Sequence, residues 1–255
     1  MAPKSQIGRA TLMTSASFVL LAVGATVLVL SVSTLSSTPA LTNLAPAMPG
    51  VVAIVVRFAG SRPEPEALRA LPNPLVSAAV VGAPLAAGLL VSRSIETVPD
   101  FDLTLVVTIG TLIGELGWRG HLYELLRPTL PPLITGLCAG VAWSLWLSSL
   151  AWAGVNPLAG TPPVEVALFA IAVATGATAA AEIKPRSIWL PAAYAATTTT
   201  GVVVFGMAPA TAGTPIPIRV LTALLLVWGL VFLVTVRYRQ LNRLPWPDTP
   251  VRRTT

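Results

Sequence analysis

Long apolar segments, separated by short polar or charged connections, recur along the whole chain. A helix needs about 20 mostly apolar residues to cross the hydrocarbon core of a bilayer. Eight segments of roughly this kind lie between clusters of charge, proline and glycine: 11–33, 44–58, 75–91, 103–120, 133–153, 164–181, 188–207 and 220–236. The pattern therefore predicts an all-α fold, a polytopic membrane helix bundle of eight transmembrane helices.

These segments also predict the domain organisation. We expect a cytoplasmic N-terminal tail over 1–10, the transmembrane domain over 11–236, and a basic, proline-containing cytoplasmic tail over 237–255. The first segment is long for a signal peptide, which favours a retained span over a cleaved one. Prolines inside other segments are compatible with helices that pack within a bundle.

The basic residues predict the orientation of the spans. Cytoplasmic loops of membrane proteins carry an excess of Lys and Arg. With eight spans and both termini in the cytoplasm, only Arg93 and Arg219 of the 16 Lys and Arg residues fall in outer loops. We therefore expect a multi-pass protein of the cell membrane. Its many alanines, and its preference for Arg over Lys, favour a bacterial plasma membrane.

Composition then excludes several kinds of chemistry. Charged residues make up 10% of the chain, against about 25% in soluble domains. The chain has one histidine, His121, and one cysteine, Cys138. It therefore cannot form an intrachain disulfide, a multi-histidine metal site or a cysteine-ligated iron–sulfur cluster. We expect no cofactor, no metal and no nucleic-acid partner. The predicted partners are membrane lipids, with a membrane protein or peptide as a further candidate.

One carboxylate lies inside a predicted span. Glu115 is four residues before Arg119, so the two share a helical face, and Gly110, Gly114 and Gly117 form a small-residue surface around them. An ionisable group at membrane depth needs a partner. One interpretation is an ion pair that orders the helix end, and the other is a functional carboxylate in a wet cavity.

Three short segments resemble a known family. Glu115-Leu-Gly-Trp-Arg119 is similar to the Glu-Glu-x-x-x-Arg motif of the CAAX protease and bacteriocin-processing (CPBP) family of intramembrane endopeptidases. Segment 141–147 resembles the family's Trp-x-x-Trp-His segment, and 187–195 resembles the segment that ends in His-x-x-x-Asn. The resemblance extends from about Leu44 onward and implies the family's eight-helix fold.

The resemblance also implies that most of the catalytic residues are missing. In the family the first Glu and two His activate a water, the Arg orders the Glu pair, and the Asn or its neighbours polarise the scissile carbonyl. Glu115 and Arg119 remain as a motif remnant. The other four positions are occupied by Gly114, Leu147, Ala195 and Thr199.

Other polar residues do not replace these groups. His121 is six residues past Glu115, about 240° around a helix, so we expect it to diverge from Glu115 and face solvent or headgroups. We expect the hydroxyls of residues 197–200 to bond back to helix carbonyls, and Cys138 to be a small packed side chain.

Three functions follow as hypotheses. The first is a catalytically impaired relative of the CAAX-type proteases that serves as a binding or regulatory scaffold. The second is an active intramembrane endopeptidase that uses Glu115 as its general base. The third is a small-molecule transporter, which the lack of a visible internal repeat disfavours.

Overall fold

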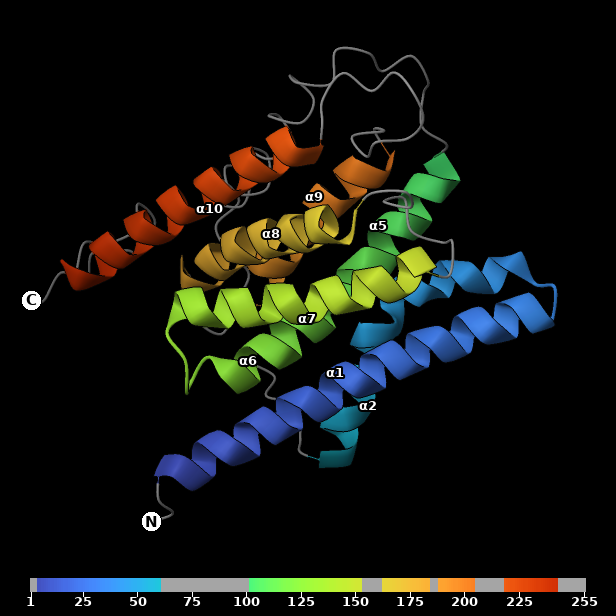
Figure 1. Cartoon of the computed structure of the whole chain (residues 1–255), viewed down its shortest axis with the longest axis horizontal. Helices are drawn as coiled ribbons and strands as arrows, with labels where there is room; N and C mark the ends of the chain where they lie inside the picture. The colour runs from blue at the N-terminus through green and yellow to red at the C-terminus, as the bar shows by residue number, and fades with distance from the viewer. Residues whose placement is uncertain (1–3, 61–100, 153–161, 184–187, 205–217, 243–255) are drawn as a thin grey trace, which may run out of the picture.

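The computed structural model describes residues 4–60, 101–152, 162–183, 188–204 and 218–242, and in this part of the chain every regular element is helical (Figure 1). The elements are α1 (Lys4–Leu35), η1 (Pro39–Ala47), α2 (Met48–Gly60), α5 (Phe101–Glu115), η2 (Leu116–Leu122), α6 (Tyr123–Leu126), α7 (Pro132–Trp152), α8 (Pro163–Ile183), α9 (Trp189–Val204) and α10 (Ile218–Leu241). The predicted all-α class is confirmed for these residues. The predicted span 75–91 lies outside them.

Three helical segments are long and apolar enough to cross a membrane. They are Thr11–Leu35 in α1, Pro132–Leu150 in α7 and Pro163–Ile183 in α8. Their length and hydropathy confirm that the described chain contains transmembrane-type helices, as expected of a membrane-embedded protein. The total of eight spans and their orientation stay predictions.

The predicted span 44–58 is divided into two kinds of helix. After α1 the chain reverses at Ser37, which has a φ of 53°, and the Ser33 hydroxyl donates a hydrogen bond to the Thr38 carbonyl at 2.9 Å. The returning segment is the 3₁₀ helix η1, which lies alongside α1, and α2 follows it (Figure 1). Pro46 lacks the N–H that an α-helical ladder needs, and regular α-helix begins at Met48, directly after η1.

The segment around the charged motif departs from α-helical geometry. Helix α5 ends at Glu115 and continues directly into η2, a π-helical stretch of 7 residues, before α6 begins at Tyr123. A π-helix is rare, and short π segments within α-helices occur frequently at functional sites. The Glu115–Arg119 motif therefore lies where α5 passes into η2, which is the one irregular stretch of the helix that runs from Phe101 to Leu126.

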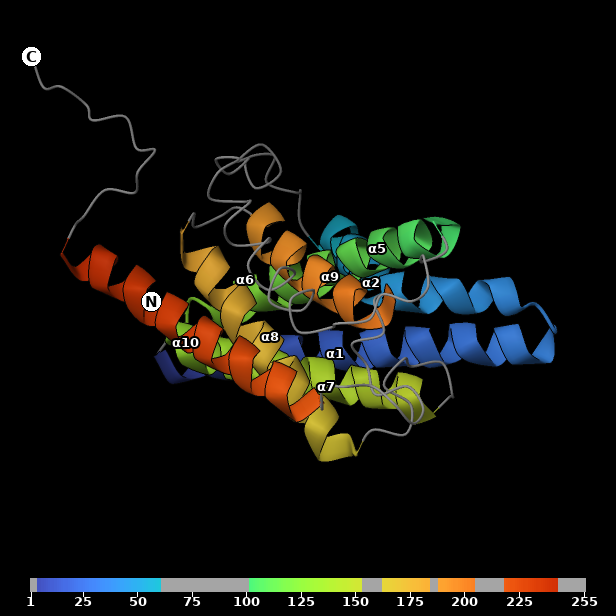
Figure 2. The same cartoon turned by 90° about the horizontal axis from the view of Figure 1, so that it is seen from above.

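Helix α8 is the centre of the C-terminal half. It packs against α7, α9 and α10 (Figure 2), and most of its residues are buried. Small residues allow this packing: a Cβ added at Gly140 of α7 would lie 2.7 Å from the Cα of Ile171, and one added at Gly229 of α10 would lie 2.8 Å from the nitrogen of Gly176. Such close backbone approach is typical of helices packed within membranes.

Helix α1 covers the other side of the molecule. Phe18 packs edge-on against Trp118 of η2, with ring centroids 5.8 Å apart, and the Trp146 indole donates a hydrogen bond of 2.8 Å to the Thr26 hydroxyl. The remaining face of α1 exposes large apolar side chains, including Leu12, Leu20 and Leu28. This arrangement suits a helix that packs on the bundle with one face and meets lipid with the other.

A glycine contact between α2 and η2 gives a direct test of this packing. A Cβ added at Gly117 would collide with the backbone of Pro49 and lie 2.9 Å from the nitrogen of Gly50. We expect Gly117→Ala to lower the free energy of unfolding by about 1–3 kcal/mol, since backbone must shift to admit the methyl group. Titration with sodium dodecyl sulfate in mixed micelles measures this change.

Gly24→Ala is the matched control. Nothing lies within 4 Å of a Cβ at Gly24, so this substitution is expected to be neutral or to stabilise α1 by up to about 1 kcal/mol through helix propensity. Equal destabilisation by both substitutions would contradict the assigned contact.

Candidate functional site

The charged motif forms a buried ion pair. Glu115 is the last residue of α5, and Arg119 lies within η2. Their side chains are each 1% exposed, and Nε of Arg119 lies 3.2 Å from Oε2 of Glu115. The pairing that the four-residue spacing predicts is thus present, and it survives the change from α- to π-helical geometry.

Helices α7, α8 and α9 enclose the Arg119 side of the pair. The guanidinium carbon lies 5.2 Å from the ring centroid of Trp143, a cation–π contact. Trp143 is in turn backed by Phe169 of α8, at 6.4 Å between ring centroids. Tyr194 of α9 is fully buried and within electrostatic range of Arg119, and its ring lies directly on Gly176 of α8.

The four positions at which the resemblance predicts replaced catalytic residues are occupied by Gly114, Leu147, Ala195 and Thr199. Leu147 and Ala195 are both part of the hydrophobic core. Gly114 is buried, and a Cβ there would collide with the carbonyl oxygen of Pro46. The hydroxyl of Thr199 donates to the carbonyl of Ala195 at 2.8 Å. Thr197 and Thr198 also bond back to helix carbonyls, which confirms that expectation for 197–199.

His121 lies elsewhere than the sequence suggests. The expectation that it faces solvent or headgroups is wrong: it is buried, and its ring centroid lies 4.9 Å from that of Phe18. The cause is α1, which covers this side of η2. His121 therefore contacts α1, whereas Arg119, the partner of Glu115, contacts α7.

Cys138 also differs from its expectation. It is exposed on α7 and is not a packed side chain. Its neighbours Thr135, Gly136, Ala139 and Gly140 form the buried face of the helix, and Gly136 and Gly140 lie against α8. This packing leaves Cys138 on the outer surface of the bundle.

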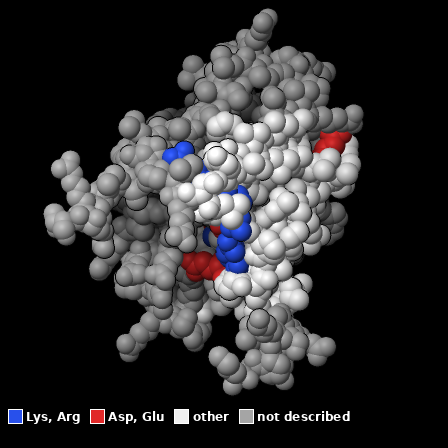
Figure 3. Space-filling model, turned by 90° about the vertical axis from the view of Figure 1, so that its left-hand side faces the viewer, with Lys and Arg blue, Asp and Glu red and all other residues white. Residues whose placement is uncertain are grey.

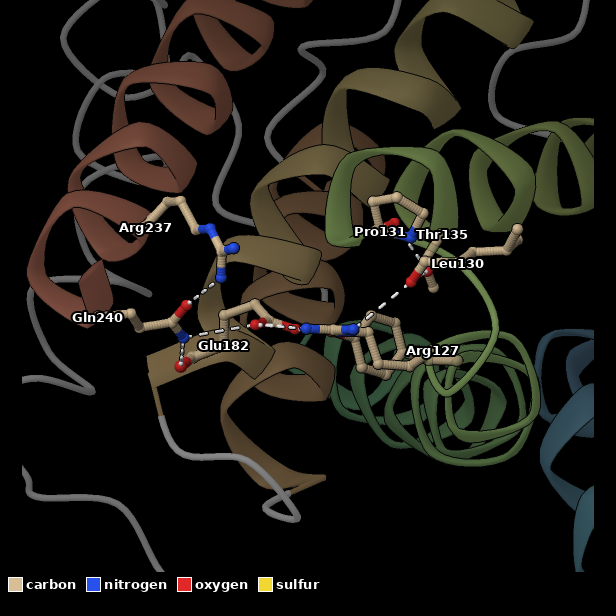
Figure 4. Close-up of polar contacts among 8 residues, drawn as sticks. Arg127, Leu130, Pro131, Thr135, Glu182, Arg237 and Gln240 are labelled. Atoms are coloured by element: carbon tan, nitrogen blue, oxygen red, sulfur yellow. Dashed lines mark hydrogen bonds and ion pairs between the residues drawn. The ribbon is translucent and has the colours of Figure 1, made fainter.

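A second buried carboxylate is Glu182, which lies one residue past the predicted span 164–181. Its Oε1 accepts a hydrogen bond from the Tyr123 hydroxyl at 2.6 Å. It also accepts one from Nε of Arg127 at 2.5 Å (Figure 4). Its Oε2 accepts from Nη2 of Arg127 at 3.1 Å and from Gln240 of α10 at 3.4 Å. The cluster therefore ties α6 and the segment after it to α8 and α10.

This cluster explains the pKa shifts around it. Burial, followed by the hydrogen bond to Glu182, raises the pKa of the Tyr123 hydroxyl above its usual range. The hydrogen bond to Glu182 also raises the pKa of Arg127. Tyr123 thus stays neutral and Arg127 charged at physiological pH, as the cluster requires. The four-residue spacing of Tyr123 and Arg127 places both on one helical face, which is the only local sign of this cluster in the sequence. Their shared partner, Glu182, is more than 50 residues away in the chain.

Basic side chains gather near the same end of the molecule. Figure 3 shows Lys and Arg atoms running down the middle of this face beside a patch of carboxylate. Arg237 is exposed and Arg127 and Arg239 are half-buried among the residues that the structure describes. Such a surface suits a membrane interface with anionic headgroups.

Metal binding has no support in the described ranges, where no group of three or more His, Cys, Asp and Glu side chains is placed to hold a metal ion. Comparison with known proteins gives no assignment, since neither a family model nor a curated protein sequence matches the chain. The resemblance to CPBP proteases rests on the motif residues themselves.

Glu182→Gln tests whether the second carboxylate is a structural tie. Loss of its charge weakens hydrogen bonds from Tyr123, Arg127 and Gln240, so we expect the free energy of unfolding to fall by about 1.5–3 kcal/mol. The exposed Glu124 of α6 supplies the control: Glu124→Gln should change stability by less than about 1 kcal/mol. Both variants are compared with wild type by denaturant titration in the same micelles, and equal effects would refute the assigned role.

Proposed function

We propose that this chain is a multi-pass protein of the bacterial plasma membrane, similar in architecture to the CPBP proteases, whose former hydrolytic site serves binding or regulation. Eight spans with cytoplasmic termini belong to this proposal. In support, the elements predicted to lie inside share one side of the molecule: the start of α1, the α6–α7 connection, and the C-terminal ends of α8 and α10 (Figure 1). The turn between α1 and η1 lies at the opposite side.

The observation that carries the proposal is the commitment of Glu115 to Arg119 inside a packed core. Hydrolysis by a carboxylate needs an ionised oxygen directed at a water and further groups that move protons. Glu115 instead faces a guanidinium, and leucine and alanine fill the two positions of the family's histidines. None of these replacements accepts a proton or orients a water.

The packing around Gly114 supports the same conclusion. The family's first glutamate would occupy this position, yet the carbonyl of Pro46 lies where even a Cβ would be. Helix η1 is therefore packed too closely for an acidic side chain at position 114. The backbone arrangement therefore excludes a glutamate at position 114, where the sequence has glycine.

The alternative is an active endopeptidase that depends on Glu115 alone. General-base catalysis by one carboxylate contributes about 10²–10⁴-fold, and Glu115 is paired with Arg119. A transporter ranks third, because Glu115 and Arg119 form a compensated pair, and a translocated substrate usually needs uncompensated polar groups near mid-membrane.

Hydrolysis is tested with purified protein in lipid vesicles. We expect no cleavage of quenched fluorescent peptides, either prenylated at a C-terminal cysteine or containing a membrane-spanning segment, because four catalytic positions are replaced. Glu115→Gln is assayed in parallel. Cleavage by wild type that disappears in Glu115→Gln would overturn the scaffold proposal and establish the endopeptidase alternative.

The orientation is tested with single cysteines introduced into Cys138→Ser. Ser36 lies in the exposed turn after α1, and Asn242 lies in the exposed turn after α10. In intact cells stripped of outer barriers, a membrane-impermeant maleimide should label Ser36→Cys directly and Asn242→Cys only after permeabilisation. The reverse pattern, or direct labelling of both, would contradict the proposed topology.

A further inference from the structure

Helix α10 carries a basic side chain that has no carboxylate partner among the described residues. The polar contact of Arg237 in this part of the chain is a hydrogen bond of 3.4 Å from its Nη1 to the neutral amide oxygen of Gln240. The two buried carboxylates, Glu115 and Glu182, are paired with other arginines. We infer that Arg237 binds the phosphate of an anionic phospholipid whose acyl chains lie along the exposed face of α10.

One face of α10 is apolar and exposed over about four turns. Its large side chains recur at intervals of three and four residues, as on one side of a helix: Val227, Leu230, Val231, Val234, Tyr238 and Leu241. The opposite face packs on α8, where Gly229 lies against the backbone of Gly176. Successive residues of a helix are about 100° apart, so Arg237 lies between the exposed Leu241 and Gln240, which contacts α8. Arg237 is therefore at the edge of the apolar face.

A chain of side-chain contacts holds Arg237 in this place. Nε2 of Gln240 donates to the main-chain carbonyl of Glu182 at 3.2 Å and to its Oε2 at 3.4 Å. This leaves the amide oxygen of Gln240 directed at Arg237 (Figure 4). Arg127 binds both oxygens of the Glu182 carboxylate. The cluster therefore contains two guanidiniums and one carboxylate, and its excess positive charge lies at Arg237. A donor that is positioned before binding loses less entropy when a ligand associates.

The length of α10 places Arg237 at the level of lipid headgroups. Arg219 and Arg237 are separated by the uncharged segment 220–236. At 1.5 Å per residue this spacing is about 27 Å, close to the thickness of the hydrocarbon core, which is about 30 Å. The two arginines therefore fit opposite headgroup layers when α10 spans the bilayer. This step rests on the membrane placement in the proposed function, and not on the loss of hydrolysis.

Charge and shape identify the ligand. A guanidinium binds two phosphate oxygens through parallel N–H donors, and basic side chains at a membrane surface attract anionic lipids. Phosphatidylcholine carries an ammonium group that already compensates its phosphate, so Arg237 favours a lipid with net negative charge, such as phosphatidylglycerol. A soluble phosphate ester would contact Arg237 alone. A phospholipid also covers the adjoining apolar side chains, which favours the lipid as the occupant.

Quenching by brominated lipids measures lipid contact at this site. Val234 is exposed and lies about one turn before Arg237, on the bilayer side, so a bimane label is attached to Val234→Cys made in the Cys138→Ser protein. Vesicles contain phosphatidylcholine and phosphatidylglycerol in varied proportions, with bromine in the acyl chains of one or the other lipid. We expect phosphatidylglycerol to bind at the label about fivefold more strongly, the change that one basic residue near a surface contributes. Equal binding of the two lipids would overturn the inference.

Three variants separate a local site from the overall charge of the protein. Arg237→Gln should abolish the preference for phosphatidylglycerol, whereas Arg237→Lys keeps the charge without the planar fork and should retain part of it. Arg219→Gln is the matched control, because it removes the same charge from the other end of the same helix. It should leave the preference unchanged. Equal losses in Arg237→Gln and Arg219→Gln would show attraction by net charge and would overturn the site.

A soluble competitor and the tests of the proposed function complete the distinction. An excess of glycerol phosphate in the buffer should leave the lipid preference unchanged. Loss of the preference would identify a soluble phosphate ester as the ligand and overturn the lipid assignment. A lipid preference combined with the reverse labelling of Asn242→Cys would refute the proposed topology and leave this site standing. Absence of the preference in a protein that labels as expected and does not hydrolyse peptides would refute this site alone.

Discussion

Close contact between backbones at glycine is the constraint on which this fold depends. A bilayer provides little hydrophobic force between helices, so association relies on packing that brings backbones together. Gly50 faces the Ile113 carbonyl, while Gly114 and Gly117 face the backbones of Pro46 and Pro49. These contacts fix η1 and α2 against the helix that carries the charged motif. They also occupy the space that a second carboxylate would require, so the glycines that allow close helix packing also exclude that carboxylate.

The buried ion pair is the consequence of this arrangement that matters most for function. Removal of two charges from water is costly, and their attraction offsets that cost only when geometry is good and the remaining hydrogen bonds are satisfied. Arg119 gains a cation–π contact with Trp143, but its nitrogens lack hydrogen-bond partners among the described residues. Such a pair is a poor source of stability.

The sequence predicted the features that depend on local spacing or on composition. Hydropathy predicted apolar helices, and the four-residue interval predicted the pairing of Glu115 with Arg119. Features set by distant contacts were missed. Nothing near His121 in the chain shows that α1 will cover it, and nothing near Glu182 shows that Tyr123, Arg127 and Gln240 will converge on it. The π-helical stretch also has no simple sequence signature, because it depends on how neighbouring helices pack.

The two buried carboxylates among the residues that the structure describes provide a comparison within one molecule. Glu182 accepts hydrogen bonds on both oxygens from three side chains, and Arg127 uses Nε and Nη2 on that carboxylate and Nη1 on the Leu130 carbonyl. This is how the chain builds an ion pair for stability: each donor has an acceptor. Glu115 and Arg119 have the same two charged groups, deeper burial and a much less complete set of hydrogen bonds. Because the same fold satisfies one pair and leaves the other incomplete, the deficit at Glu115 and Arg119 is a local property of that site.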